Sequence, residues 1–129
     1  MVRILSLSFC FFILFSCKKE PGVGGNASIT GKVITRDYNA TFTNLLGVYP
    51  SADQYVYIVF GDHVGYDKRI KTDYNGVYRF SYLYPGKYTI YTYSMDSTGT
   101  QLSGIIPVKK EIQLSKKQHF QMPDLIIYE

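Results

Sequence analysis

The chain has no tryptophan and only two cysteines, Cys10 and Cys17, among its 129 residues. Cys10 lies in an apolar N-terminal segment of the kind removed on secretion, which leaves Cys17 as the single cysteine of the mature chain. This excludes an internal disulfide. The folded part must therefore be stabilised by its apolar core, which about 100 residues can provide when burial is good.

Catalytic signatures are also missing. We find no serine in a nucleophile elbow, no phosphate-binding loop, no cysteine nucleophile and no motif for a cofactor. The only histidines are His63 and His119, and acid–base catalysis would need a partner that the sequence does not identify. We expect a non-catalytic protein. The alternative is a small envelope hydrolase or metal-binding protein that uses His63 or His119.

The excess of positive charge is small, with 14 basic and 10 acidic residues. The basic residues are scattered in pairs, at Lys18-Lys19, Lys68-Arg69, Lys109-Lys110 and Lys116-Lys117. Binding of nucleic acid needs a concentrated basic surface, so we expect no nucleic-acid partner.

The N-terminus has the three parts of a secretory signal. Met1–Arg3 supplies one positive charge, Ile4–Phe15 is largely apolar, and Ser16 precedes Cys17. An apolar run of this length is too short to span a bilayer as a helix. The ending Leu14–Cys17 resembles the lipobox of bacterial lipoproteins, which implies a signal peptide over 1–16 and a lipid on Cys17.

Residues 17–27 are expected to form a lipidated N-terminus and a flexible tether, because they are polar, contain Gly and Pro, and show no periodicity. Lys18-Lys19-Glu20 resembles the sequences that follow the cysteine in surface lipoproteins of Bacteroidota. That resemblance implies an outer-membrane location in a Gram-negative bacterium and leaves open whether the protein faces the periplasm or the cell surface.

The rest of the chain, residues 28–129, is predicted to be a single all-β domain, because it is rich in Tyr, Thr, Val and Ile and has no helical periodicity. Gly, Pro, Asn and Asp separate the apolar runs at spacings typical of a sandwich. The seven expected strands are Ser28–Arg36, Gln54–Phe60, Lys68–Thr72, Val77–Tyr82, Lys87–Met95, Ile105–Leu114 and His119–Tyr128.

Two connections stand out. Asp73–Gly76 is predicted to close a hairpin between two short strands, with Gly76 free to take a positive φ. Asp37–Asp53 is the longest segment without a strand signal, and it contains several apolar residues. We expect such a loop either to pack down as a cover or to carry function.

Alternation along each strand predicts which side chains point inward. The expected core-facing residues are Ile29, Gly31, Val33, Thr35, Val56, Ile58, Phe60, Tyr78, Phe80, Leu83, Tyr88 and Ile90.

The segment Thr72–Ile90 reads TDYNGVYRFSYLYPGKYTI, and Ile29–Val33 reads ITGKV. Both resemble prealbumin-like (transthyretin-like) modules, namely the carboxypeptidase regulatory-like and collagen-adhesin B-type domains. The resemblance covers residues 28 to about 114 and implies a seven-stranded Greek-key β-sandwich. In it Pro85-Gly86 turns the chain between sheets, and Tyr88 buries its ring while its hydroxyl bonds a nearby backbone group, as in a tyrosine corner.

Members of these families are mostly non-catalytic, so the resemblance implies a binding or structural role and no particular chemistry. Some adhesin members carry a Lys–Asn isopeptide crosslink, and no residue of this chain is assigned to one. A hydrolase of related fold ends in a Tyr-Arg-Gly-Ser tail, whereas this chain ends Leu125–Glu129. That difference disfavours the hydrolase.

Four tyrosines are the best candidates for a binding surface. Alternation points Tyr55, Tyr57, Tyr91 and Tyr93 away from the core, and on neighbouring strands their rings would form an aromatic patch. Exposed tyrosine rings stack on sugars or fill pockets on a protein, so the patch predicts an envelope protein or a glycan as partner. The alternative is that they are ordinary cross-strand pairs that only stabilise the sheet.

Asp62, His63 and Asp67 lie together in one short segment and could ligate a metal. With one histidine and no second cluster the pattern is weak, and polar turn residues explain it. No metal site is therefore predicted.

Overall fold

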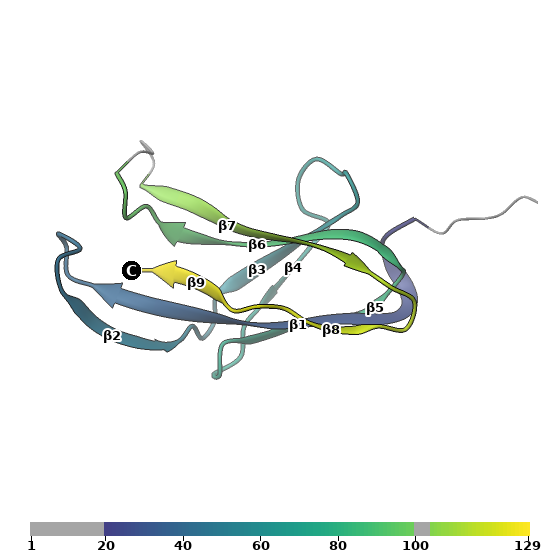
Figure 1. Cartoon of the computed structure of the whole chain (residues 1–129), viewed down its shortest axis with the longest axis horizontal. Coiled ribbons are helices and arrows are strands. Elements are labelled where there is room, and N and C mark those ends of the chain that lie inside the picture. Colours follow the sequence, from purple (N-terminus) through teal and green to yellow (C-terminus); the bar gives the residue numbers. More distant parts are fainter. Residues whose placement is uncertain (1–19, 100–103) are drawn as a thin grey trace, which may run out of the picture.

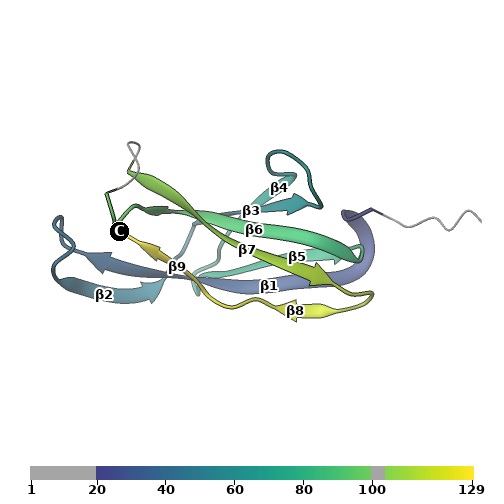
Figure 2. The same cartoon turned by 45° about the horizontal axis from the view of Figure 1, so that its top comes forward.

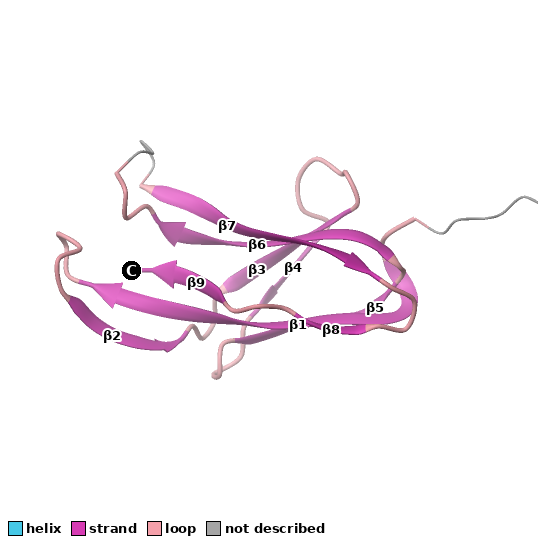
Figure 3. Ribbon diagram, viewed as in Figure 1, coloured by secondary structure: helices cyan, strands magenta, loops and turns pink. Residues whose placement is uncertain are grey.

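The computed structural model describes residues 20–99 and 104–129, which form nine β-strands and no helix (Figures 1 and 3). Consequently, no helix able to cross a bilayer occurs in these two ranges. The all-β sandwich is confirmed, whereas the expected count of seven strands is wrong. The strands are β1 (Val23–Tyr38), β2 (Leu45–Pro50), β3 (Tyr55–Phe60), β4 (Lys68–Lys71), β5 (Val77–Leu83), β6 (Gly86–Met95), β7 (Ile105–Leu114), β8 (His119–Gln121) and β9 (Leu125–Tyr128).

The strands form two sheets that lie over one another (Figure 2). In the first sheet β1 is central: it pairs antiparallel with β2 and β5, and parallel with β8 and β9. The second sheet has the order β4-β3-β6-β7 and is antiparallel throughout. The 16 residues of β1 run along nearly the whole length of the first layer (Figure 2).

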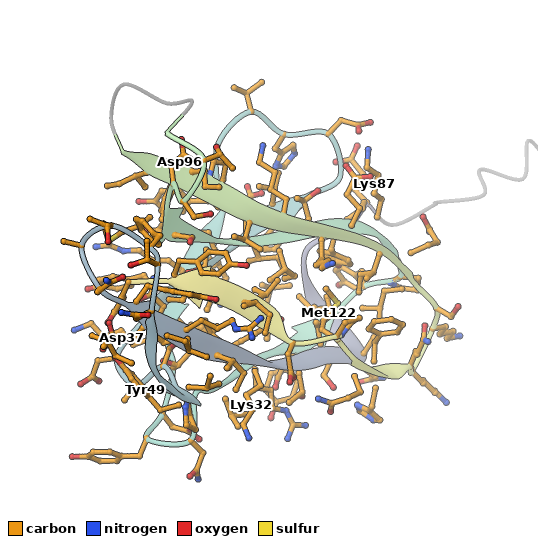
Figure 4. The ribbon with its side chains drawn as sticks, turned by 60° about the vertical axis from the view of Figure 1, so that its left-hand side comes forward. Lys32, Asp37, Tyr49, Lys87, Asp96 and Met122 are labelled. Carbon is orange, nitrogen blue, oxygen red and sulfur yellow. The ribbon has the colours of Figure 1, made fainter. Side chains whose placement is uncertain are left out.

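The core lies between the two sheets and matches the predicted inner faces. Every residue expected to face inward is buried except Phe60, which is half-buried and packs against the core. Met122 also lies between the layers (Figure 4). Each large apolar side chain removed from water here contributes about 1.5–3 kcal/mol, which explains how the domain folds without a disulfide.

The structure has two strands more than predicted, because β2 has no strand pattern in the sequence and the expected last strand is divided in two. The loop expected over Asp37–Asp53 contains the end of β1 and all of β2, an edge strand that pairs only with β1. Leu45–Pro50 does not alternate between apolar and polar residues and includes Gly47, so it carries no period-two signal. The expected last strand is divided into β8 and β9 around Pro123, which has no N–H to give to the ladder.

The first strand begins at Val23, five residues before the expected start at Ser28. Val23 and Ala27 both pair with Leu83, and the register shifts between them. The Tyr84 N–H also donates to the Gly22 carbonyl at 2.8 Å. Residues 22–27 therefore belong to the folded domain. Their polar composition had suggested a flexible tether instead.

The turn at Asp73–Gly76 forms as expected, but it does not close a hairpin. Gly76 has φ +73°, and its N–H donates to the Asp73 carbonyl at 3.0 Å. The Asp73 carboxylate accepts from the N–H groups of Asn75 and Val77 at 2.8 and 2.9 Å. The flanking strands β4 and β5 lie in different sheets, so the turn carries the chain from one layer to the other.

Tyr88 forms the corner predicted for it. Its ring is fully buried, and its hydroxyl donates to the Tyr84 carbonyl at 2.6 Å and accepts from the Gly22 N–H at 2.8 Å. One hydroxyl thus joins Gly22, just before β1, to Tyr84 at the Pro85-Gly86 turn. At this turn the chain passes from β5 to β6, and so from the first sheet to the second.

Tyr78 is buried to the same degree, but its hydroxyl has no hydrogen-bond partner among the described residues. The hydroxyl lies against Gly31, where a Cβ atom would collide with it. Burial raises the pKa of Tyr78, and the nearby charge of Asp124 raises it further. An unpaired buried hydroxyl opposes folding, because it loses its hydrogen bonds to water and gains none in return.

The two tyrosines give a matched test of this difference. We expect Tyr78→Phe to raise the free energy of unfolding by about 1 kcal/mol, because it removes an unpaired polar atom. Tyr88→Phe should lower it by about 1–3 kcal/mol, because it leaves the Gly22 N–H without its partner. Urea unfolding of the two variants measures both values, and a loss of stability in Tyr78→Phe would contradict this account.

Candidate functional site

The four predicted tyrosines lie together on the outer face of the second sheet. β3 pairs with β6 so that Tyr57 stands directly opposite Tyr91. Tyr55 and Tyr93 lie two residues away on the same strands and therefore face the same side. The structure thus brings all four residues into one cluster.

The rings contact one another closely. Tyr57 stacks on Tyr91 with ring centroids 5.0 Å apart and an interplanar angle of 10°. Tyr93 meets both rings edge-on, at 5.6 Å from Tyr57 and 5.7 Å from Tyr91. Tyr55 lies 6.4 Å from Tyr57. Offset-stacked and edge-to-face contacts of this kind stabilise a pair by about 0.5–1.5 kcal/mol beyond the area they bury.

Their exposure differs. Tyr55 and Tyr93 are 37% and 44% exposed, whereas Tyr91 is only 9% exposed because its neighbours cover it. That burial, together with Tyr93, raises the pKa of Tyr91. The outer rings are therefore the ones that a ligand can reach, and Tyr57 and Tyr91 form the support beneath them.

A fifth tyrosine, Tyr66, completes the cluster and was not predicted. It comes from the β3–β4 loop, meets Tyr57 edge-on at 4.9 Å, and is 50% exposed. Strand alternation gives no information about a loop residue, so no signal in the sequence could have placed it. We call Tyr55, Tyr57, Tyr66, Tyr91 and Tyr93 the tyrosine face.

Cations flank the tyrosine face on the side of β4. The guanidinium carbon of Arg69 lies 4.4 Å from the centre of the Tyr55 ring, and the Lys71 ammonium lies 5.1 Å from it. Both distances are within the range of a cation–π interaction.

A groove of about 400 Å³ adjoins the tyrosine face. Its two tyrosines are Tyr91 and Tyr93 of β6, and its other residues come from β3, β6, β7 and the β3–β4 loop. The lining consists of Val59, Gly61, Asp62, His63, Gly65, Lys87, Thr89, Tyr91, Tyr93, Pro107, Lys109 and Glu111. Aromatic rings, carboxylates and ammonium groups therefore meet in one hollow.

One ion pair and one histidine–carboxylate contact order the loop side of the groove. The Lys87 ammonium donates to the Asp62 carboxylate at 2.7 Å, which raises the pKa of Lys87 and lowers that of Asp62 (Figure 4 shows Lys87). His63 Nδ1 lies 2.9 Å from Asp67 Oδ1. The other Asp67 oxygen accepts from the Phe60 N–H at 2.7 Å, which ties the loop to the end of β3.

These contacts engage the side chains on which the metal-binding alternative depends, and the hydrolase candidates are engaged as well. Asp62 is paired with Lys87, while His63 is paired with Asp67, and the described residues contain no cluster of three metal-ligating side chains. His119 Nδ1 lies 2.7 Å from the Ser28 hydroxyl, but Ser28 is 3% exposed and so out of reach of a substrate.

The segment Asp37–Asp53 was expected either to pack down as a cover or to carry function. It does not cover the tyrosine face. Its strand β2 pairs with β1 in the first sheet, whereas the tyrosine face lies on the outside of the second. The tyrosines are therefore not shielded by this segment.

Comparison with known protein families finds no family that matches the chain, and comparison with curated proteins gives no significant match. Among solved structures, the chain is similar to a proposed carbohydrate-binding protein from Pseudomonas aeruginosa, with 15% identity and a TM-score of 0.49, over 84% of this chain and 91% of that one. A similarity of this size is too low to indicate a shared function.

The contact between Tyr57 and Tyr91 can be measured by a double-mutant cycle. We expect Tyr57→Ala and Tyr91→Ala to be coupled by about 0.5–1.5 kcal/mol in the free energy of unfolding. Either substitution alone already removes the stacked pair, so the double variant does not lose that contact a second time. As the matched control, Tyr57→Ala combined with Tyr74→Ala should be additive, since Tyr74 is almost fully exposed in the β4–β5 turn. Additivity in both cycles would contradict the stacking.

Proposed function

We propose that this protein is a lipid-anchored envelope protein of a Gram-negative bacterium, and that its prealbumin-like β-sandwich binds a glycan without catalysis. The observation that carries the binding role is the position of the tyrosine face beside the groove. Aromatic rings and hydrogen-bonding groups are both available there to one ligand.

A sugar ring matches this combination. Its C–H face packs against an aromatic ring, and its hydroxyls donate hydrogen bonds to carboxylates and accept them from ammonium groups. Tyr93 lines the groove together with Asp62, Lys87 and Glu111, and its ring is partly exposed. Tyr66 offers a second partly exposed ring on the adjoining tyrosine face. Both signs of charge are present, which suits a neutral polyhydroxylated ligand better than a strongly charged one.

A protein partner is the second candidate, and one observation favours it. β2 forms an edge of the first sheet and exposes Leu45, Leu46 and Val48, without a charged residue in the strand. Native proteins normally protect such an edge, so an exposed apolar edge strand is suited to pairing with another chain. This surface is separate from the tyrosine face, and binding at one need not exclude the other.

The lipid anchor is supported by the sequence. Cys17 lies outside the described residues, so its place in the proposal depends on the apolar segment before it and the small residue Ser16. An outer-membrane location is the part of the proposal supported by Lys18-Lys19-Glu20.

The anchor is tested by mass spectrometry of the protein from membranes of a Gram-negative host. We expect a chain that begins at Cys17 and carries acyl groups, and we expect Cys17→Ser to abolish both the acylation and the membrane association. Ser16→Ala is the matched control, since it keeps a small residue before the cysteine. An unmodified Cys17 in the wild-type chain would contradict the anchor.

Glycan binding is tested with an array of bacterial polysaccharides, followed by calorimetry on the sugar that binds best. Tyr93→Ala and Tyr66→Ala should each weaken binding by about tenfold, because each removes one aromatic contact. Tyr74→Ala and His119→Ala should leave the affinity unchanged, since both residues lie outside the groove and outside the tyrosine face. Equal losses in all four variants, or no binding to any glycan, would contradict the proposal.

A further inference from the structure

The end of the sandwich where the chain enters the fold has a pocket of its own. Three segments meet there: residues 21–26, the β5–β6 turn and the β7–β8 turn (Figure 1). The pocket has a volume of about 590 Å³ and is lined by Pro21, Gly24, Gly25, Asn26, Tyr84, Pro85, Gly86, Gln113, Lys116 and Lys117. Half of these residues are prolines and glycines, and the two lysines are the only charged ones.

Pro21 and Gly22 are fixed at this end of the sandwich by close packing and hydrogen bonds. The Gly22 N–H donates to the Tyr88 hydroxyl at 2.8 Å, and the Gly22 carbonyl accepts from the Tyr84 N–H at 2.8 Å. Gly86 has no space for a side chain, because a Cβ atom there would overlap the Pro21 ring. The chain is therefore held to the fold from Pro21 onward.

This packing makes the connection to the proposed anchor short. Only residues 18–20 separate Cys17 from Pro21. Fully extended, this stretch spans at most about 14 Å, so an acylated Cys17 would keep this end of the sandwich close to the membrane surface. At physiological salt the field of charged headgroups extends about 8 Å.

The side chains at this end suit a membrane surface. Lys116 and Lys117 are exposed in the β7–β8 turn and form no ion pair with any described residue. Tyr82, at the end of β5, is 71% exposed and has φ +58°, a conformation that L-residues seldom adopt. Tyrosine and lysine are the side chains that accumulate where a protein meets lipid headgroups.

We infer that this end of the sandwich docks on the membrane that holds the anchor, with Lys116 and Lys117 binding the phosphate groups of anionic lipids. The inference rests on the proposed acylation of Cys17. Charge complementarity and the short connection favour lipid over a soluble partner. Two lysines at an anionic surface favour the docked orientation by roughly thirtyfold over a freely tumbling one.

The orientation can be measured with single fluorophores, because an introduced cysteine is the only free thiol once Cys17 is acylated. Ser115→Cys places the label beside the two lysines, and Asn44→Cys places it in the β1–β2 turn at the opposite end (Figure 1). The acylated full-length mature chain is reconstituted into phosphatidylcholine vesicles, with or without phosphatidylglycerol, that contain a lipid with a quencher on its headgroup.

We expect strong quenching of the label at position 115 in vesicles with phosphatidylglycerol and much weaker quenching without it, while the label at position 44 stays bright in both. Lys116→Gln with Lys117→Gln should reduce quenching at position 115 to the level in pure phosphatidylcholine. Lys32→Gln with Lys110→Gln removes the same charge from β1 and β7, away from both the groove and this end of the sandwich, and should leave the quenching unchanged.

Three results would overturn the docked orientation: quenching at position 115 that does not depend on lipid charge, equal quenching at position 44, or an equal loss in the Lys32/Lys110 variant. The anchor is judged separately, by whether the chain floats with pure phosphatidylcholine vesicles. A chain that floats but shows one of these three results overturns the orientation alone. A chain that does not float overturns the anchor, and the orientation with it.

Discussion

The first sheet depends on the hydrogen bonding of a single strand, β1. Its backbone pairs with β2 and β5 on antiparallel ladders and with β8 and β9 on parallel ones, so four strands from across the sequence are joined only through it. The same strand contributes Ile29 and Val33 to the core beneath the second sheet. The tyrosine face on the far side of that sheet is therefore supported, through the core, by the register of β1.

The inner faces of the strands could be predicted from sequence because burial imposes a period of two wherever one face is covered. The corner at Tyr88 could be predicted because a turn, a ring and a hydroxyl are all local to Tyr84–Tyr88. The pairing of β4 with β3, and of β5 with β1, is not local, so the turn between β4 and β5 was predicted correctly whereas the hairpin predicted around it was wrong. Edge strand β2 was missed for a related reason: with little of it buried, its residues are free of the alternation that reveals a strand.

The candidate site shows the same division. Alternation along the strands predicted that four tyrosines face outward, namely Tyr55, Tyr57, Tyr91 and Tyr93. Only the register between β3 and β6 places Tyr57 against Tyr91. Packing then alters their availability, since the most central ring, Tyr91, is nearly covered by the others. The groove combines residues from β3, β6, β7 and the β3–β4 loop, and no pattern within one segment could have assembled it.

The parallel ladders between β1 and the pair β8 and β9 have a consequence for the order in which the domain folds, and so for the export proposed above. Residues 119–128 are needed to complete a sheet whose central strand begins at Val23, so nearly the whole domain must be available before that sheet can close. Contacts so distant in sequence form late in folding. This order suits the export proposed above, because a chain that has not closed its first sheet stays open during translocation and acquires its rigid form only on the far side.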